Sequence, residues 1–324
     1  MTALPDIHSL VDVHAHFVPD DYRAALVTAG HECPDGMPEI PEWSAHEHVA
    51  MMDRLGIGAS LLSISSPGVY LEGVDAADLA RAVNEAGRKV AVDHPGRFGQ
   101  LASLPLPDLD ATLAEIEYCC DLLGVDGFAL LTNVGGVSVA DPACAPVFDE
   151  LDRRGARVFL HPTSPPCWEQ TSFGRPRPML EFFFETTRTV VELILNGTVA
   201  GHPGIEFVVP HAGAALAMVA DRASVFSFLL DADPSVDVLA DLGRLHYDLA
   251  GFAVPRQLDA LRTLVDDAHL HYGSDFPFTP EFAVVGQRDQ LATTDMFAGL
   301  AANTRRLFPT LDAPASTDHP HGDA

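Results

Sequence analysis

Eight short apolar runs, separated by helical patterns or longer polar segments, constrain the fold of this chain more than any other feature. The runs lack the strict alternation of half-exposed strands, so they are typical of parallel strands covered on both faces. Eight such strands alternating with helices along a chain of 324 residues predict a (β/α)8 TIM barrel, an α/β fold. The expected strands are 10–17, 59–65, 98–105, 125–132, 157–162, 206–212, 245–250 and 270–275, and the expected helices are 76–94, 108–123, 143–154, 179–200, 213–231 and 255–266.

An open, doubly wound sheet is the alternative fold for the same alternation of strands and helices. Such a sheet often carries a G-x-G-x-x-G motif after its first strand, where it binds a dinucleotide. No such motif follows the first expected strand here. The barrel is therefore the favoured interpretation.

Two long polar segments interrupt the regular alternation. Residues 19–45 follow the first expected strand, and residues 163–180 follow the fifth. On a barrel both would lie at the face where the strands end, which is where active-site loops gather. We expect a distorted barrel with these two active-site insertions, a single domain over residues 1–312, and a polar disordered tail over 313–324.

Composition excludes several classes of partner. The formal net charge of −27 argues against nucleic acid, because a phosphate backbone requires clustered basic residues. No apolar stretch approaches the roughly 20 residues of a membrane span, and the N-terminus lacks the pattern of a secretion signal. The five cysteines show no zinc-like pairing and suit free thiols in a reducing compartment. We expect a cytoplasmic protein with a small-molecule substrate.

Residues of the kind that bind metal ions lie at the ends of four of the apolar runs. VDVHAHF carries His14 and His16, RVFLHPT carries His161, FVVPHAG carries His211, and HYGSDFPF carries Asp275. In a strand, residues two apart point to the same face, so His14 and His16 project together. Imidazole and carboxylate groups bind zinc and other first-row divalent ions.

Each of these residues by itself also has an ordinary structural explanation, that of a buried polar group bonded to backbone. On a barrel, however, the C-terminal ends of different strands meet around one pocket. This convergence favours a metal-dependent enzyme over a set of unrelated buried residues. Asp248, near the end of the seventh expected strand, is placed to act as a hydrogen-bond partner of a ligand.

With these motifs the chain resembles the amidohydrolase superfamily, in particular its branch of nonoxidative decarboxylases related to aminocarboxymuconate semialdehyde decarboxylase. Matching stretches include DVHAHFVP, ASLPLPD, VFLHPTSPP, FVVPHAGA and YGSDFPF. LLTNVGG and ETTRTVVELILNGT are most similar to 6-methylsalicylate decarboxylase-type proteins.

The resemblance implies a metal-dependent nonoxidative decarboxylase, a carboxy-lyase, acting on a small aromatic (ortho-hydroxybenzoate-like) or dienoic carboxylic acid. The alternative is a metal-dependent hydrolase of a lactone, amide or other acyl substrate, because the same ligands serve both chemistries. A non-catalytic protein with a structural metal is a third interpretation. It is disfavoured because structural zinc is usually closed by four Cys or His ligands.

The resemblance also implies roles at the site. One divalent metal ion, zinc or manganese, would be held by His14, His16, His161 and Asp275. His211, together with Asp275, would be catalytic and handle the proton. Relatives with two metals bridge them with a carboxylated lysine at the end of strand four, but the single lysine of this chain, Lys89, lies in a charged helical stretch. A lysine-bridged pair of metals is therefore excluded.

Substrate contacts follow from the same resemblance. Arg222 matches an arginine that reaches a neighbouring subunit's site in the aminocarboxymuconate enzyme and binds a carboxylate there, which implies a homodimer or higher homo-oligomer. An ordinary salt bridge on a helix surface is the alternative for Arg222, and Arg188 is a second candidate for the carboxylate. An apolar wall suited to a flat substrate is expected from aromatic residues near the second insertion and beside the ligands. These residues are Trp168, Phe173, Phe182 to Phe184, Phe17 and Phe276.

Overall fold

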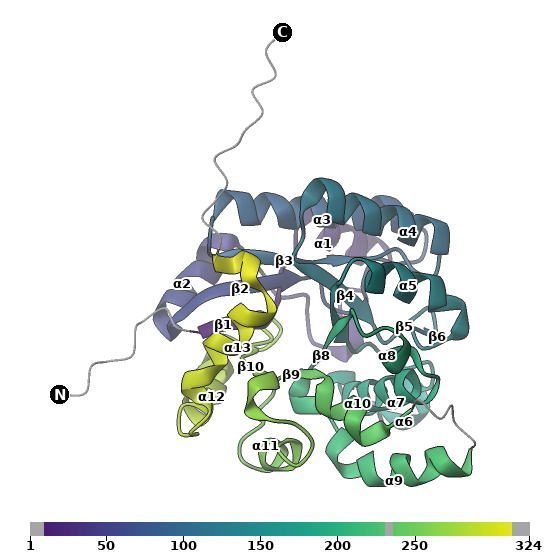
Figure 1. Ribbon diagram of the computed structural model, residues 1–324. Coiled ribbons are helices and arrows are strands. Elements are labelled where there is room, and N and C mark those ends of the chain that lie inside the picture. Colours follow the sequence, from purple (N-terminus) through teal and green to yellow (C-terminus); the bar gives the residue numbers. More distant parts are fainter. Residues whose placement is uncertain (1–9, 231–235, 313–324) are drawn as a thin grey trace, which may run out of the picture.

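The computed structural model describes residues 10–230 and 236–312, and the expected disordered tail lies outside these ranges. Eight parallel strands follow one another around the sheet in the order β1-β2-β3-β4-β7-β8-β9-β10 (Figure 1). Bridges join Asp12 to Tyr272 and Ala15 to Phe276, so the chain directly after β10 returns to β1. The predicted barrel is confirmed.

Every expected strand overlaps an observed one. The strands are β1 Leu10–His16, β2 Ile57–Ser63, β3 Phe98–Ser103, β4 Gly127–Leu131, β7 Arg157–His161, β8 Glu206–Val209, β9 His246–Asp248 and β10 Leu270–His271. Two further strands, β5 (Asn133–Val134) and β6 (Val137–Ser138), form a small hairpin that was not expected. Its turn residues Gly135 and Gly136 both have positive φ (58° and 84°), the conformation that a two-residue hairpin turn requires.

Helices cover the outside of the barrel. They are α1 Asp20–Thr28, α2 Ala45–Leu55, α3 Ala76–Asp93, α4 Leu109–Tyr118, α5 Ala145–Arg153, α6 Trp168–Thr171, α7 Glu181–Leu195, α8 Thr198–Gly201, α9 Leu216–Leu229, α10 Val238–Arg244, α11 Arg256–Leu261, α12 Glu281–Leu291 and α13 Leu300–Leu307. Aspartates begin several of them, as at α3, where the Asp75 side chain accepts hydrogen bonds from the Ala77 and Asp78 amides.

Three expected helices differ from the observed ones. The helix expected over 255–266 ends at Leu261, the last residue of α11. The helix expected over 108–123 continues from α4 into a π-helical turn over Cys119–Leu123. The helix expected over 179–200 is divided into α7 and α8, because Gly197 adopts a left-handed conformation with φ of 80° that breaks regular helix geometry.

A layer of apolar side chains fills the barrel and closes one end of it. Six strands each contribute one residue, and Leu307 and Phe308 pack against them from the end of α13: the strand residues are Val13, Leu61, Leu101, Ala129, Phe159 and Val208. The ring of His14 lies against Phe159, with 4.9 Å between ring centroids. This apolar layer therefore lies directly beneath the histidines at the ends of the strands.

Candidate metal centre

The predicted ligands meet at one point inside the barrel. One ligand atom from each of His14, His16 and His161 lies within 4.8 Å of the others, and the same holds for His14, His211 and Asp275. Asp275 Oδ1 is 3.3 Å from His16 Nε2 and 3.5 Å from His14 Nε2. Residues from the ends of β1 and β7 and from the turns after β8 and β10 thus surround one small volume.

The backbone takes unusual conformations to bring these groups together. Asp275 has φ of 59°, and its amide donates to the His14 carbonyl at 2.7 Å. After β8, His211 and Ala212 also have positive φ, at 56° and 51°. Such conformations are rare outside glycine and tend to occur at functional sites, where the surrounding structure maintains them.

Neighbouring polar groups fix the orientation of the imidazole rings. His14 Nδ1 is 2.8 Å from Asp248 Oδ2, and Asp248 Oδ1 accepts from the His211 amide at 3.0 Å. His161 Nδ1 donates to the Pro162 carbonyl at 2.7 Å. Partners of this kind set the tautomer and leave Nε2 available to a metal, so the contact expected of Asp248 is present.

The donor set fits a divalent cation. His14 Nε2 and His16 Nε2 are buried without a hydrogen-bond partner among the described residues. A buried imidazole nitrogen without a partner is costly, and a metal ion bound at these nitrogens would remove that cost. Three imidazoles and one carboxylate are ligands that zinc and manganese accept.

Electrostatics at the site also favour a positive charge. Burial by itself lowers the pKa of His14, but the negative charges of Asp248 and Asp275 outweigh it and raise this pKa to about 9. Burial lowers the pKa of His16 and His161, and it lowers that of His211 to about 4. The carboxylates therefore stabilise one cation here, while most of the imidazoles remain neutral and able to bind a metal.

A cavity of about 130 Å³ opens onto these residues. Apolar cavities of about 150 Å³ bind benzene, so the space suits a single aromatic ring. Both insertions contribute to its wall: the lining residues are Pro34, Asp35, Met37, Ser65, His161, Pro178, Phe182, His211, Asp275, Phe278 and Thr279. Of these, Asp35, Ser65 and Thr279 carry no recognisable sequence signal, because they lie in loops whose path only the folded chain reveals.

Two of the aromatic residues expected at the wall lie elsewhere. Phe276 packs against His48, with 4.8 Å between ring centroids, and the guanidinium carbon of Arg177 lies 4.1 Å from the ring centroid of Trp168. Phe182, which was also expected at the wall, lines the cavity together with Phe278.

Neither candidate arginine lines the cavity of its own chain. Arg188 is 3.4 Å from Glu185 with its side chain 56 % exposed. Arg222 is exposed on α9, with its guanidinium carbon 4.9 Å from the Phe226 ring centroid. Lys89 lies on α3, where its Nζ pairs with Asp93 at 2.5 Å, far in sequence from the end of β4.

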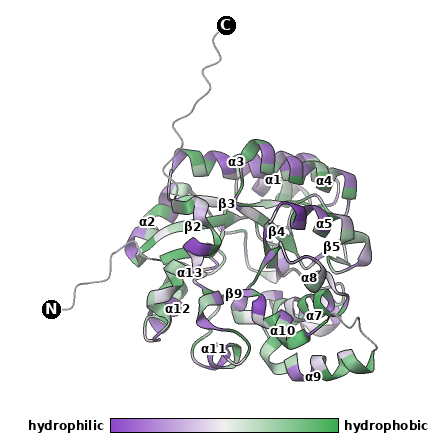
Figure 2. Cartoon of the chain, viewed as in Figure 1, coloured by the Kyte–Doolittle hydropathy of each residue, from purple (hydrophilic) through white to green (hydrophobic). Residues whose placement is uncertain are grey.

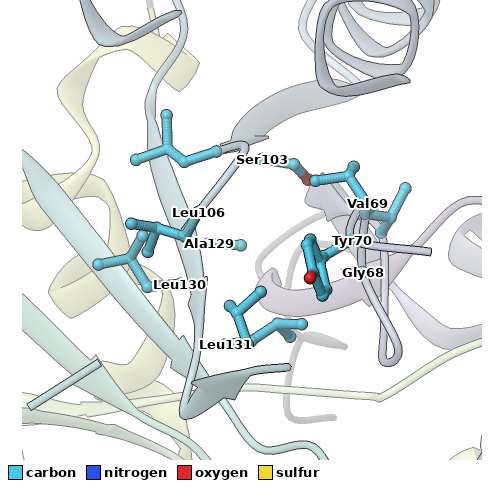
Figure 3. A pocket seen from close by; sticks show the side chains of 11 residues that line it. Gly68, Val69, Tyr70, Ser103, Leu106, Ala129, Leu130 and Leu131 are labelled. Atoms are coloured by element: carbon cyan, nitrogen blue, oxygen red, sulfur yellow. The ribbon is translucent and has the colours of Figure 1, made fainter. Parts of the chain in front are cut away.

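A second, smaller cavity lies at the ends of β2, β3 and β4 (Figure 3). Its volume is about 20 Å³, and its lining includes no carboxylate, imidazole or thiol. Its wall consists of Ile64, Gly68, Val69, Tyr70, Ser103, Leu104, Leu106, Ala129, Leu130, Leu131 and Val134. The chemistry therefore belongs to the histidine-lined cavity.

The chain belongs to the amidohydrolase family, whose model matches residues 11–309. It is 34% identical over 283 residues to a 6-methylsalicylic acid decarboxylase of Penicillium expansum, covering 85% of this chain and 87% of that protein. It is 33% identical over 319 residues to a 6-methylsalicylic acid decarboxylase of Aspergillus aculeatus, covering 93% and 96%.

Solved structures show the same fold. An amidohydrolase II structure superposes with a TM-score of 0.85 at 35% identity, covering 93% of this chain and all (100%) of that one. A 5-carboxyvanillate decarboxylase of Sphingomonas paucimobilis superposes with a TM-score of 0.83 at 20% identity, covering 93% and 98%, which supports the fold alone. Within the described residues, no helix is long and apolar enough to cross a membrane.

Proposed function

We propose that this protein is a metal-dependent nonoxidative decarboxylase of a small ortho-hydroxybenzoate-like acid. The observation that carries the proposal is the pair of unpartnered nitrogens, His14 Nε2 and His16 Nε2, beside Asp275 at a cavity sized for one ring. The relatives with 33–34% identity are decarboxylases of an aromatic acid, which favours loss of carbon dioxide over acyl hydrolysis.

One divalent ion, zinc or manganese, is the proposed cofactor, and its ligands are His14, His16, His161 and Asp275. When bound, it supplies charge stabilisation and orientation for a carboxylate and its neighbouring hydroxyl. The apolar side chains of Phe182 and Phe278 line the cavity and hold the ring flat. Exclusion of water from this cavity strengthens the electrostatic interactions within it.

The proton is handled by His211 and Asp275. His211 stacks on Phe183 with 5.5 Å between ring centroids, and its Nδ1 has no hydrogen-bond partner among the described residues. Because burial lowers the pKa of His211 to about 4, this imidazole is neutral near pH 7, so it must take up a proton before it can transfer one to the ring carbon. The carbon–carbon bond then breaks, its electrons return to the ring, and carbon dioxide leaves.

The test is carbon dioxide release from a panel of ortho-hydroxybenzoates by metal-loaded protein in deuterium oxide. Deuterium at the ring carbon that carried the carboxylate is the expected result. His211→Ala and Asp275→Asn should each abolish release, whereas Asp53→Asn, on the exposed end of α2, should not. Absence of release from every aryl acid, with the metal bound, would refute the proposal, and solvent ¹⁸O in an acid product would indicate hydrolysis instead.

The same proposal includes a homodimer or higher homo-oligomer formed through α9. Met218, Arg222, Val225 and Leu229 follow one helical face, and the three apolar members are 71%, 59% and 69% exposed. Figure 2 shows that hydrophobic residues predominate on α9. An exposed apolar patch of this kind is typical of a protein interface, and it would carry Arg222 to a partner's cavity.

Sedimentation of the wild-type protein and of Val225→Asp tests this assembly. The wild-type protein should sediment as a dimer or larger species, and Val225→Asp as a monomer with a raised KM. A fully active wild-type monomer would overturn the role of Arg222. The five cysteines are all free, which supports the reducing cytoplasm as the proposed location.

A further inference from the structure

Asp35 lines the cavity, and the mechanism above assigns it no role. It lies in the first insertion, in a 3₁₀ turn over Pro34–Gly36, and is only 8% exposed. Pro34 and Met37 stand beside it in the same wall. A buried carboxylate facing a ligand cavity needs a hydrogen-bond donor.

A chain of hydrogen bonds determines which oxygen of Asp35 is available. Arg177 Nε donates to Ser164 Oγ at 3.1 Å, and Ser164 Oγ bonds to Asp35 Oδ1. Since arginine is only a donor, the Ser164 hydroxyl accepts from Arg177 and must direct its own proton to Asp35. Among the described residues, no hydrogen bond reaches Asp35 Oδ2, so this oxygen is left for a ligand.

The backbone around Asp35 is built to hold it in this place. Asp35 has φ of 53°, a left-handed conformation that aspartate and asparagine adopt more readily than other side chains. At the next residue, Gly36 has φ of 74°, which favours glycine, and a Cβ there would lie 2.6 Å from Arg177 Nη1 and displace that guanidinium. The two insertions are therefore joined tightly through Asp35, Ser164 and Arg177.

We propose that Asp35 accepts a hydrogen bond from a hydroxyl group on the ring of the bound aromatic ligand and selects for that donor. Asp35 is thus a specificity residue, and Ser164 and Arg177 are positioning residues. An ionised carboxylate only accepts hydrogen bonds, so a ring that presents an ether oxygen in this place leaves the carboxylate unpaired. The inference rests on the proposed function in taking an aromatic ring as the ligand.

Asp35→Asn is the sharpest test, because asparagine keeps the shape and tolerates the backbone. With Ser164 still donating, the amide oxygen stays at Ser164 and the amide NH2 faces the cavity, so an acceptor is replaced by a donor. The probes are two pairs, resorcinol with 3-methoxyphenol and hydroquinone with 4-methoxyphenol, bound to metal-loaded protein in a calorimeter. The wild type should prefer the diol in at least one pair, and Asp35→Asn should lower that preference about ten- to hundredfold, the range for hydrogen bonds to charged groups.

Two further variants complete the experiment. Glu39→Gln, an exposed position in the same insertion, should leave the preference unchanged. Ser164→Ala keeps the charge of Asp35 but removes its orienting donor, so the preference should fall by a few-fold only. The proposal is overturned if folded, metal-loaded Asp35→Asn keeps both preferences within twofold, or if neither diol binds the wild type. This experiment measures binding and not turnover. Its result therefore tests the role of Asp35 even if the protein decarboxylates no acid.

Discussion

Two histidine clusters lie on different elements of the barrel, and they differ in how their ring nitrogens are used. The inner cluster is the candidate metal centre. The outer cluster consists of His246, His269 and His271, and it lies between β9, β10 and α13. In the outer cluster, His246 Nδ1 and His271 Nε2 are 2.9 Å apart, and His271 Nδ1 is 3.0 Å from Thr304 Oγ1.

The outer nitrogens hydrogen-bond to one another, whereas two of the inner ones have no hydrogen-bond partner among the described residues and lie near Asp275 Oδ1. His246 Nε2 completes the outer network with Glu206 at 3.3 Å. In the inner cluster, His14 Nε2 and His16 Nε2 are buried and unpartnered. A group of histidines is thus a structural element where its hydrogen bonds are complete, and a candidate site where nitrogens remain available.

The largest expected difference between the clusters is in metal content. His161→Ala should lose the bound ion and reduce carbon dioxide release about a thousandfold, because the metal supplies several kcal/mol of charge stabilisation. His246→Ala is the matched control and should keep both the bound ion and the wild-type rate of carbon dioxide release. Elemental analysis of the purified variants, with the rate of release, checks the pair. Equal metal content in the two variants would contradict the assignment of the metal to the inner cluster.

A smaller effect on metal binding is expected from residues that orient the ligating histidines without binding the metal themselves. Asp248→Asn weakens the hold on His14, so metal affinity should fall about ten- to hundredfold. Ser63→Ala should have less effect, because His16 Nδ1 retains the Ser63 carbonyl at 3.3 Å. Competition with a chelator measures both affinities. A larger loss for Ser63→Ala than for Asp248→Asn would contradict the role of Asp248.

The outer cluster should affect stability and not the metal. His271→Gln disturbs hydrogen bonds to His246 and Thr304 inside the protein, which should cost about 1–3 kcal/mol of unfolding free energy. Urea unfolding of metal-loaded protein measures this cost. Metal affinity should equal that of the wild type, and a loss of affinity would show that the clusters are coupled.

The smallest effect is a difference in pH dependence. Burial holds the pKa of His271 well below 6.5 in the folded protein, whereas the unfolded chain takes up that proton near 6.5. The unfolded state therefore binds more protons below pH 6.5, and stability falls as the pH falls, by about 1.4 kcal/mol per pH unit for one histidine. His271→Gln should reduce the slope of unfolding free energy against pH by about that amount between pH 6 and 5, and an unchanged slope would contradict it.

Much of the fold could be predicted from local patterns. Strand β7 illustrates this, because RVFLH is apolar, short and bounded by loop residues, and it was expected within one residue of its observed end at His161. The divided helix at Gly197 and the π-helical turn after α4 were missed, since helical periodicity continues through both. Glycine in a helical pattern does not by itself reveal that the chain turns there.

The candidate ligands could be named in advance, because the strand ends of a barrel converge whatever the conformation of the loops. The cavity wall could be predicted only in part: Phe182 lines it as expected, but Phe276 and Trp168 do not, and Phe278 was not expected there. Which side of a loop a ring occupies depends on packing between segments far apart in sequence. Asp35 and Ser164, 129 residues apart, are another example of such packing.

The sequence by itself determined the barrel, the residues gathered at its strand ends, and the absence of a lysine-bridged metal pair, because these depend on periodicity, topology and composition. Only the tertiary structure decided which histidines have free nitrogens. His14 and His271 are both buried histidines of barrel strands, and the H-x-H spacing of His14 and His16 does not reveal which nitrogens lack a hydrogen-bond partner. Their difference is one of partners: His14 Nε2 has no hydrogen-bond partner among the described residues and lies 3.5 Å from Asp275 Oδ1, while His271 is bonded at both nitrogens.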